Sequence, residues 1–424
     1  MDRSRLTRTV EQALRDQPVT DLHTHCYAPA FGASPQPRGL LLWGIDELVT
    51  YNYLVAEVFR AAPASGPAYD RFWSMPRTRQ ADHIWKTLFV DRTPVSEACR
   101  GVLTTLERLG LDPNEKSLEP YRKWCARQSP DQYVDKVMQL ANVDSITMTN
   151  EVFSDHERTL WLEDPDRLRD SRFQPALRID PLLNETSAAL ECLNSWGYDT
   201  DPQVSQKTID EVKRFLTDWI NRMKPIYLAT SLPPSFRYPD AAHQTRDRII
   251  NRVLLPVLGE HGLAWAMMIG ARRGINPSLH DAGDTGGHAD VSAVTHLCAT
   301  YPGSKFLVTM LARDNQHELC VAARKFGNLM LFGCWWFLNN PSLIEEITRM
   351  QLELLGMSFI PQHSDARILD QLIYKWDHTR TVLAKVLTDK YTDLGATGYD
   401  ITDKLIHRDI AWLLRDQFRS FIQR

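Results

Sequence analysis

The stretch that decides the fold is PVTDLHTH, residues 18–25, in which a short apolar strand ends in polar side chains. His23 and His25 stand two residues apart, so both point to the same face of a strand. Two imidazoles that converge at the end of a strand supply half of the ligands of a metal site. A pair of histidines that are merely hydrogen-bonded is the alternative, but the preceding Asp21 and the position after the first strand favour a metal.

Short apolar runs alternate with amphipathic segments in the rest of the chain. Together with residues 18–25 they make eight units, the other seven being 143–149, 173–179, 225–230, 263–270, 305–311, 328–337 and 357–363. Strands that alternate with helices predict an α/β fold with a parallel sheet. Eight such units predict a (β/α)₈ barrel of the TIM type. A doubly wound open sheet is the competing architecture, although no GxGxxG motif follows any of these strands.

The long segment after the first strand has a different character. Residues 39–145 contain no convincing strand and are typical of helices rich in aromatic side chains. We therefore expect a helical subdomain inserted after the first strand. The predicted division is an N-terminal helix and first strand in 1–38, the helical insertion in 39–142, and the remainder of the barrel in 143–424.

Composition excludes several classes of protein. Of the 424 residues, 43% are hydrophobic and 24% are charged, with a formal net charge of −4, which is ordinary for a globular protein and indicates neither a nucleic-acid nor a membrane partner. The seven cysteines form no CxxC pair, and the N-terminus has no apolar signal core. We expect reduced thiols and a cytoplasmic location.

A third metal ligand is expected at the end of another strand. Asp365, in FIPQHSDAR at the end of the eighth run, would complete a site of two histidines and one carboxylate with open positions for substrate and water. The divalent ion would be zinc by default. Asp365 could instead cap the helix that follows, although Ser364 is an equally good cap, and from its own sequence context the two roles are balanced.

Several segments resemble a known family. DLHTH at 21–25 resembles the first-strand signature of the amidohydrolase superfamily. Five further segments are similar to segments of the uronate isomerases (glucuronate isomerases), a branch of that superfamily. They are TNEVFSDHER at 149–158, FQPALRID at 173–180, MMIGARRGIN at 267–276, GCWWFLN at 333–339 and HSDAR at 363–367. The resemblance covers 18–60 and 143–424 in patches, and its Trp-Trp-Phe and Asp-x-Arg elements are specific only in combination.

The resemblance implies an aldose–ketose isomerase that moves a proton between C1 and C2 of a hexuronic acid such as glucuronate or galacturonate. Such chemistry needs an electrophile at the carbonyl, an acid and a base near the two carbons, and cations for the substrate carboxylate. The family pattern implies that Asp365 both binds the metal and moves the proton. Tyr53 would move the hydroxyl proton, with packing in the helical insertion as an equally weighted alternative.

Six further residues are candidates for substrate contact. They are Arg178, Arg273, Arg367, Asn52, His363 and Trp335. Each arginine lies just after a strand and could bind the carboxylate or sugar oxygens, or could form a surface ion pair. His363 could instead lie behind the ligands and orient Asp365, and core packing is the stronger expectation for Trp335.

The sequence also departs from the family pattern. Met268 stands where the family has a histidine on the fifth strand, and a thioether cannot replace an imidazole on such a metal. Asn52 replaces a histidine of the family. A metal-dependent hydrolase or decarboxylase acting on another small acidic substrate is therefore the alternative function. The expected partner is a small sugar acid, and the sequence leaves open whether the chain forms a homo-oligomer.

Overall fold

The computed structural model describes residues 2–35, 39–61 and 66–423. The strands are β1 (Val19–Asp21), β2 (Val143–Thr147), β3 (Phe173–Gln174), β4 (Leu177–Arg178), β5 (Tyr227–Leu232), β6 (Ala264–Ile269), β7 (Ala271–Arg272), β8 (Thr285–Gly286), β9 (Lys305–Met310) and β10 (Leu329–Leu331).

The α-helices lie between and after these strands. They are α1 (Arg3–Asp16), α2 (Ile45–Val49), α3 (Asn52–Ala61), α4 (Tyr69–Trp73), α5 (Arg77–Trp85), α6 (Glu97–Arg108), α7 (Glu119–Cys125), α8 (Pro130–Ala141), α9 (Asp155–Glu163), α10 (Asp180–Asn184), α11 (Thr186–Ser195), α12 (Gln206–Met223), α13 (Gln244–Ile249), α14 (Leu255–His261), α15 (Ser292–Thr300), α16 (Gln316–Ala323), α17 (Pro341–Leu355), α18 (Gln371–Ala396), α19 (Asp403–Ala411) and α20 (Gln417–Gln423). Within the described ranges, none of these helices is both long enough and apolar enough to cross a membrane.

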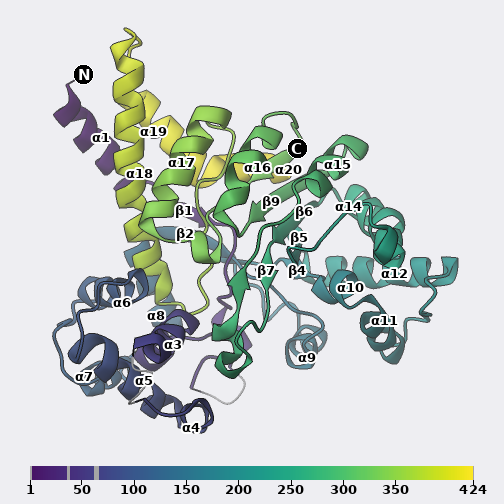
Figure 1. Ribbon diagram of the computed structural model, residues 1–424, viewed down its shortest axis with the longest axis horizontal. Coiled ribbons are helices and arrows are strands. Elements are labelled where there is room, and N and C mark those ends of the chain that lie inside the picture. Colours follow the sequence, from purple (N-terminus) through teal and green to yellow (C-terminus); the bar gives the residue numbers. More distant parts are fainter. Residues whose placement is uncertain (1, 36–38, 62–65, 424) are drawn as a thin grey trace.

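The main strands form two parallel sheets. The smaller sheet has the order β1-β2-β3, and the larger has the order β10-β9-β6-β5-β4, with every neighbouring pair parallel. β7 and β8 form a separate antiparallel ribbon after β6. Figure 1 shows the sheets in the middle of the molecule with helices on both sides. The fold is therefore α/β, as the alternation of strands and helices predicts.

Successive residues along the central strands belong to two different hydrophobic clusters. Trp265 and Met267 of β6 pack in the cluster under the helices, whereas Ala266 and Met268 belong to a second cluster on the other face of the sheet. This period of two is the pleat of a strand buried on both faces. The second cluster also contains Leu22, which follows β1, so it joins residues from both sheets.

Two of the eight expected strands are interrupted. The expected strand at 173–179 is split into β3 and β4 around Pro175, because proline has no N–H for the ladder. In the run 357–363 only Ile360 makes a bridge, to Phe332, and Pro361 follows it directly. Single backbone hydrogen bonds nevertheless link these segments to their neighbours, among them Asn150 N to Ala176 O at 2.9 Å and Gly333 N to Ile360 O at 2.8 Å.

Residues 44–141, in the part that the structure describes, are helical. Buried side chains of α2 to α7 form a separate hydrophobic cluster, which includes Leu54, Phe72, Trp85 and Val102, whereas those of α8 pack in the main core. α6 and α8 pack against the long helix α18. In Figure 1 α3 to α7 gather at one end of α18, away from α10 to α15.

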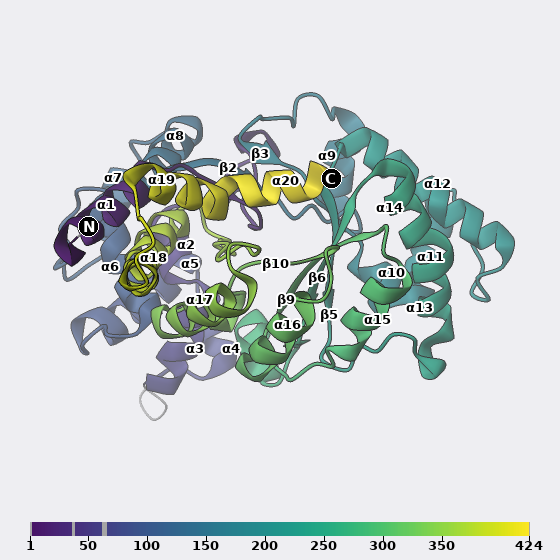
Figure 2. The ribbon, with the colours of Figure 1, turned by 90° about the horizontal axis from the view of Figure 1, so that it is seen from above.

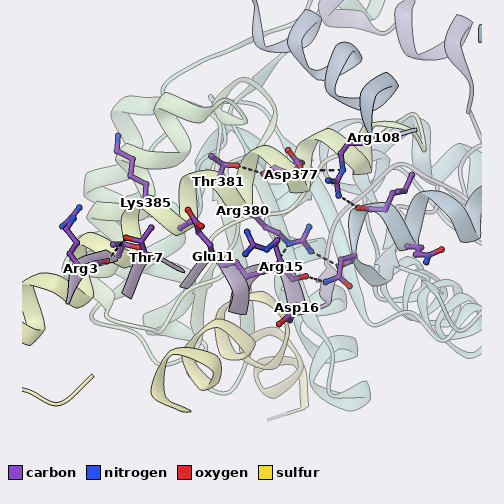
Figure 3. A pocket seen from close by; sticks show the side chains of 16 residues that line it. Arg3, Thr7, Glu11, Arg15, Asp16, Arg108, Asp377, Arg380, Thr381 and Lys385 are labelled. Atoms are coloured by element: carbon purple, nitrogen blue, oxygen red, sulfur yellow. Dashed lines mark hydrogen bonds and ion pairs between the residues drawn. The ribbon is translucent and has the colours of Figure 1, made fainter. Parts of the chain in front are cut away.

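Arg380 of α18 joins three helices. Its guanidinium donates hydrogen bonds to the carbonyls of Leu14 at 3.0 Å, Ala141 at 2.7 Å and Asn142 at 2.9 Å. These carbonyls end α1 and α8, where the helix dipoles favour a cation. Figure 3 shows Arg380 among the side chains that line a cleft of about 880 Å³ between these helices. These three acceptors anchor the guanidinium, which gives Arg380 a structural role.

The C-terminal helices close one end of the sheets. Figure 2 shows α19 and α20 running from α18 toward the strands. The Lys305 ammonium, at the start of β9, donates to the carbonyl of Ile422 at 2.8 Å, and Phe418 packs near Tyr227 at the start of β5. Because α20 covers the amino-terminal ends of these strands, the carboxyl ends are left for a functional site.

Candidate metal centre and active site

Three predicted ligands come together where the first and last runs end. Oδ1 of Asp365 lies 3.5 Å from Nε2 of His23 and 3.4 Å from Nε2 of His25. All three ligand atoms lie within 4.8 Å of one another. A backbone hydrogen bond of 3.1 Å from Asp365 N to His23 O ties the two chain segments together.

The three residues fit a divalent cation. Both ring nitrogens of His23 and Oδ1 of Asp365 are buried without a hydrogen-bond partner, which is costly for polar atoms. The separations of 3.4 and 3.5 Å are too long for good hydrogen bonds. They match the roughly 3.3 Å expected between ligands that each lie about 2.0–2.1 Å from a tetrahedral zinc ion.

Neighbouring groups fix the orientation of His25. The Thr149 hydroxyl donates to the carbonyl of Thr24 at 3.0 Å and lies 2.9 Å from Nδ1 of His25. Since its one proton is given to that carbonyl, the hydroxyl accepts from Nδ1–H and leaves Nε2 with a free lone pair. Burial also lowers the pKa of His25, which favours the neutral imidazole that binds metals. Thr149 follows the second strand, a position that could have marked it in the sequence.

Asp21, at the end of β1, connects this strand to the segment that carries Asp365. Its carboxylate accepts from Ser364 N at 3.1 Å and from Nε1 of Trp376 at 2.8 Å. Burial raises the pKa of this carboxyl, although the hydrogen bonds oppose the shift. Asp21 therefore acts through the backbone that carries Asp365.

His363 lies behind the ligands. Its ring centroid is 5.2 Å from those of both His23 and Phe332. Its side chain is fully buried, and the residue does not line the cavity at the site. Burial lowers its pKa well below the usual value. His363 therefore packs against the ring of a candidate metal ligand and does not reach the cavity wall.

A cavity of about 440 Å³ opens in front of the three ligands. Most of the predicted site residues line it, namely His23, His25, Asp365, Asn52, Arg178, Arg273, Arg367 and Trp335. Met268 is also on the wall, where the resemblance places a histidine of the family. The volume suits a small molecule.

Tyr51 lines the cavity, and Tyr53 does not. The two rings meet edge to face with centroids 5.0 Å apart, and Tyr53 packs on toward Phe337. Tyr51 and Tyr53 do not point to the same side, because α3 begins at Asn52 and turns the ring of Tyr53 away from the cavity. Burial raises the pKa of both phenols, so both stay protonated at neutral pH.

The three arginines differ in what already holds them. Arg178 donates to both carboxylate oxygens of Asp180, at 3.0 and 2.6 Å, and to Glu151 at 2.6 Å. The side chain of Arg273 is 62% exposed, lies over the ring of Trp336 and pairs with Asp284.

Arg367 is the least constrained of the three. Its side chain is 49% exposed and lies 3.6 Å from Asp281. A pair so long and so exposed is weak. Arg367 is therefore the guanidinium most available to an anionic ligand.

A buried carboxyl group beside the cavity was not singled out from the sequence. Glu157 accepts from the Tyr27 hydroxyl at 2.8 Å, from Nδ2 of Asn150 at 2.7 Å and from the backbone of Glu151 at 2.8 Å. Burial raises its pKa. Glu157 lies in the segment TNEVFSDHER, whose resemblance to the uronate isomerases was the sequence signal that could have marked this residue.

No protein-family model matches the chain, and no curated protein does. The crystal structure of a uronate isomerase from Bacillus halodurans C-125 matches with a TM-score of 0.95 and 52% sequence identity, over 100% of this chain and 97% of that one. A uronate isomerase from Thermotoga maritima has a TM-score of 0.70 at 16% identity, covering 99% and 97%. A glucuronate isomerase from Caulobacter crescentus has a TM-score of 0.76 at 13% identity, covering 99% and 94%. The last two matches show the shared fold.

Two histidines that follow β1 and an aspartate that follows the last apolar run define an α/β protein with a site suited to a divalent cation. At 52% identity over the full length, the likeness to the Bacillus halodurans structure goes further. The chain belongs to the uronate isomerase family, which confirms the resemblance of its sequence motifs.

Proposed function

We propose that this protein is an aldose–ketose isomerase that acts on a hexuronic acid of the glucuronate or galacturonate type. The observation that carries the proposal is the 52% identity to a uronate isomerase over the whole chain. The cavity adds support, because it combines three candidate metal ligands with the half-exposed guanidinium groups of Arg273 and Arg367.

The reaction conserves the atoms of the substrate. The hydrogen on C2 of the open-chain aldose moves to C1, and the proton of the C2 hydroxyl moves to the oxygen on C1. The C1 carbonyl is thereby reduced and C2 is oxidised, with no external electron donor or acceptor. A divalent ion, zinc by default, held by His23, His25 and Asp365, would supply polarisation of the carbonyl.

The residues of the chain then take distinct roles. Asp365 faces the cavity and is proposed to carry the proton between the two carbons. Tyr51 takes the role that the sequence assigned to Tyr53, because its ring is the one on the cavity wall. Arg367 and Arg273 are proposed to bind the substrate carboxylate.

Four other predicted residues support the same site. Arg178 is proposed to hold Glu151 and Asp180 in place, because its donors are already engaged by them. Asn52 and Trp335 would shape the wall against the sugar. His363 would support His23 from behind.

We also infer that the two parallel sheets are arcs of one closed (β/α)₈ barrel. Its support is the inner cluster that joins Leu22 to Met268, and the hydrogen bonds at Asn150, Gly333 and Asp365 that span the gaps. Residues 39–142 would then be a helical insertion between the first part, 1–38, and the remainder, 143–424. A cytoplasmic location and a homo-oligomer stay predictions.

The test is a panel of uronic acids assayed for ketose formation. Glucuronate or galacturonate should give a ketose of unchanged mass, with any deuterium from heavy water confined to C1 or C2. Asp365→Asn should abolish the conversion, because the amide cannot accept the proton. Asp393→Asn, at an exposed position of α18, is the matched control and should keep full activity.

Labelled water distinguishes the alternative function. A metal-dependent hydrolase would place oxygen from the water in a carboxyl product, and a decarboxylase would release carbon dioxide. Either product in the absence of ketose would contradict the proposal, and so would neutral sugars that react as fast as the uronates.

A further inference from the structure

The backbone of Asp365 has an unusual conformation. Its φ angle is +51°, in the left-handed region that residues with a side chain seldom adopt. Such a conformation is strained for residues other than glycine, although aspartate tolerates it better than most. The surrounding contacts must therefore hold this residue in place, and strain of this kind is typical of functional sites.

Hydrogen bonds hold the peptide bond that precedes Asp365 from both sides. Its N–H donates to the carbonyl of His23 at 3.1 Å. The carbonyl of Ser364, on the other side of that peptide, accepts from the Lys375 ammonium at 2.6 Å and from Nδ2 of Asn339 at 2.9 Å. The orientation of the peptide therefore depends on side chains from α18 and from the segment before α17.

Lys375 is an unusual residue at this place. It is 3% exposed, and among the described residues its ammonium forms no ion pair, although the charges of Asp365 and Asp21 act on it from farther away. A buried ammonium without such a partner costs free energy, and burial lowers the pKa of this lysine. Methionine has nearly the same length and would fill the space without that cost. The hydrogen bond to Ser364 is the one that distinguishes lysine from methionine here.

We propose that Lys375 is a positioning residue for the metal site, which holds the Ser364–Asp365 peptide so that the carboxylate faces the two histidines. Asn339 shares the task through the same carbonyl. The inference rests on the proposed function only in that His23, His25 and Asp365 bind a divalent ion. Neither Lys375 nor Asn339 lines the cavity, so neither touches the substrate.

The test compares Lys375→Met with Lys385→Met. Lys385 lies on the same helix, but its side chain is 61% exposed and pairs with Glu345. We expect Lys375→Met to weaken zinc binding by about 10–100-fold, as loss of a group that orients a ligand does. It should also lower kcat while KM changes less than about twofold, since the substrate contacts stay. Lys385→Met should match the wild type in both measurements.

Three further measurements keep the inference falsifiable. Cobalt substituted for zinc should give altered absorption bands in Lys375→Met and unaltered bands in Lys385→Met, because the bands report the ligand geometry. Asn339→Ala should weaken zinc binding in the same direction but less, and it replaces Lys375→Met if the latter does not fold. Denaturant unfolding of every variant separates loss of zinc from loss of the fold.

Two outcomes would overturn the inference, and they differ. If the wild type binds zinc, and Lys375→Met and Asn339→Ala both bind it equally well, Lys375 has no positioning role while the proposed function stands. If the wild type binds no divalent ion in a titration against a chelator, the proposed metal site is wrong and this inference fails with it.

Discussion

Replacement of Gly333 by alanine tests how tightly the site is built. Gly333 lies just after β10 with φ +65°, and a Cβ atom there would lie 1.9 Å from Nδ1 of His363 and 2.8 Å from its backbone nitrogen. The backbone atom cannot move away easily. Because the ring of His363 lies against that of His23, the added methyl group should displace a metal ligand as well.

The expected loss of stability can be estimated from these contacts. An alanine in the left-handed region costs about 1–2 kcal/mol. Forcing an extra methyl group into a packed site costs a further ~1–3 kcal/mol. We expect Gly333→Ala to lower the free energy of unfolding by about 2–5 kcal/mol in total.

Two other glycines separate the contributions. Gly356 has φ +62° and ψ −122° with nothing within 4 Å of its would-be Cβ, so Gly356→Ala should cost only the backbone strain of about 1–3 kcal/mol. Gly303 has neither a left-handed φ nor a close neighbour. Gly303→Ala should be neutral or stabilising by about 0.4–1 kcal/mol, because alanine restricts the unfolded chain.

Urea unfolding followed by tryptophan fluorescence measures the three free energies, and metal analysis of the same samples measures zinc content. Gly333→Ala should be the least stable variant and the one that loses zinc. If it unfolds at the same free energy as Gly356→Ala and keeps its zinc, the contact with His363 does not constrain the site as argued.

Three further predictions concern charge and proton transfer. Burial raises the pKa of Asp370, so its contribution to stability is complete below the unfolded pKa of about 3.9 and is lost as the pH rises through the higher folded pKa. Asp370→Asn should remove this loss, so the difference in unfolding free energy between the wild type and Asp370→Asn should change with pH. A difference that stays constant with pH would contradict the prediction. Arg367→Lys keeps the charge but loses the planar fork, so kcat/KM for uronates should fall about 10–100-fold, and wild-type kinetics would remove this residue from the site. Tyr51→Phe should lower kcat at least about 100-fold with zinc retained, whereas Tyr53→Phe should have a small effect, and the reverse order would restore the assignment made from the sequence.

Local patterns in the sequence were enough for the fold class and for the core of the site. The spacing of two between His23 and His25 predicted that both point to the same side, although β1 ends at Asp21 and both residues follow it, and Asp365 comes after the last apolar run of the chain. The alternation of apolar runs with amphipathic segments specified parallel α/β structure, because strand and helix periodicities are properties of a few consecutive residues. Prolines 175 and 361 interrupted two expected strands in a way that the same local reasoning could have marked.

Tertiary structure decided the orientation of each side chain and the partner that it meets. It turned Tyr51 toward the cavity and Tyr53 away, although both are aromatic residues of the same segment. It gave the donors of Arg178 to Glu151, 27 positions earlier, and placed Lys375 beneath the carbonyl of Ser364. Such contacts depend on how strands and helices distant in sequence pack together, which no periodicity within one segment encodes. The sequence therefore supplied most of the candidate residues, while packing between distant segments determined which side chains face the cavity, Tyr51 and Glu157 among them.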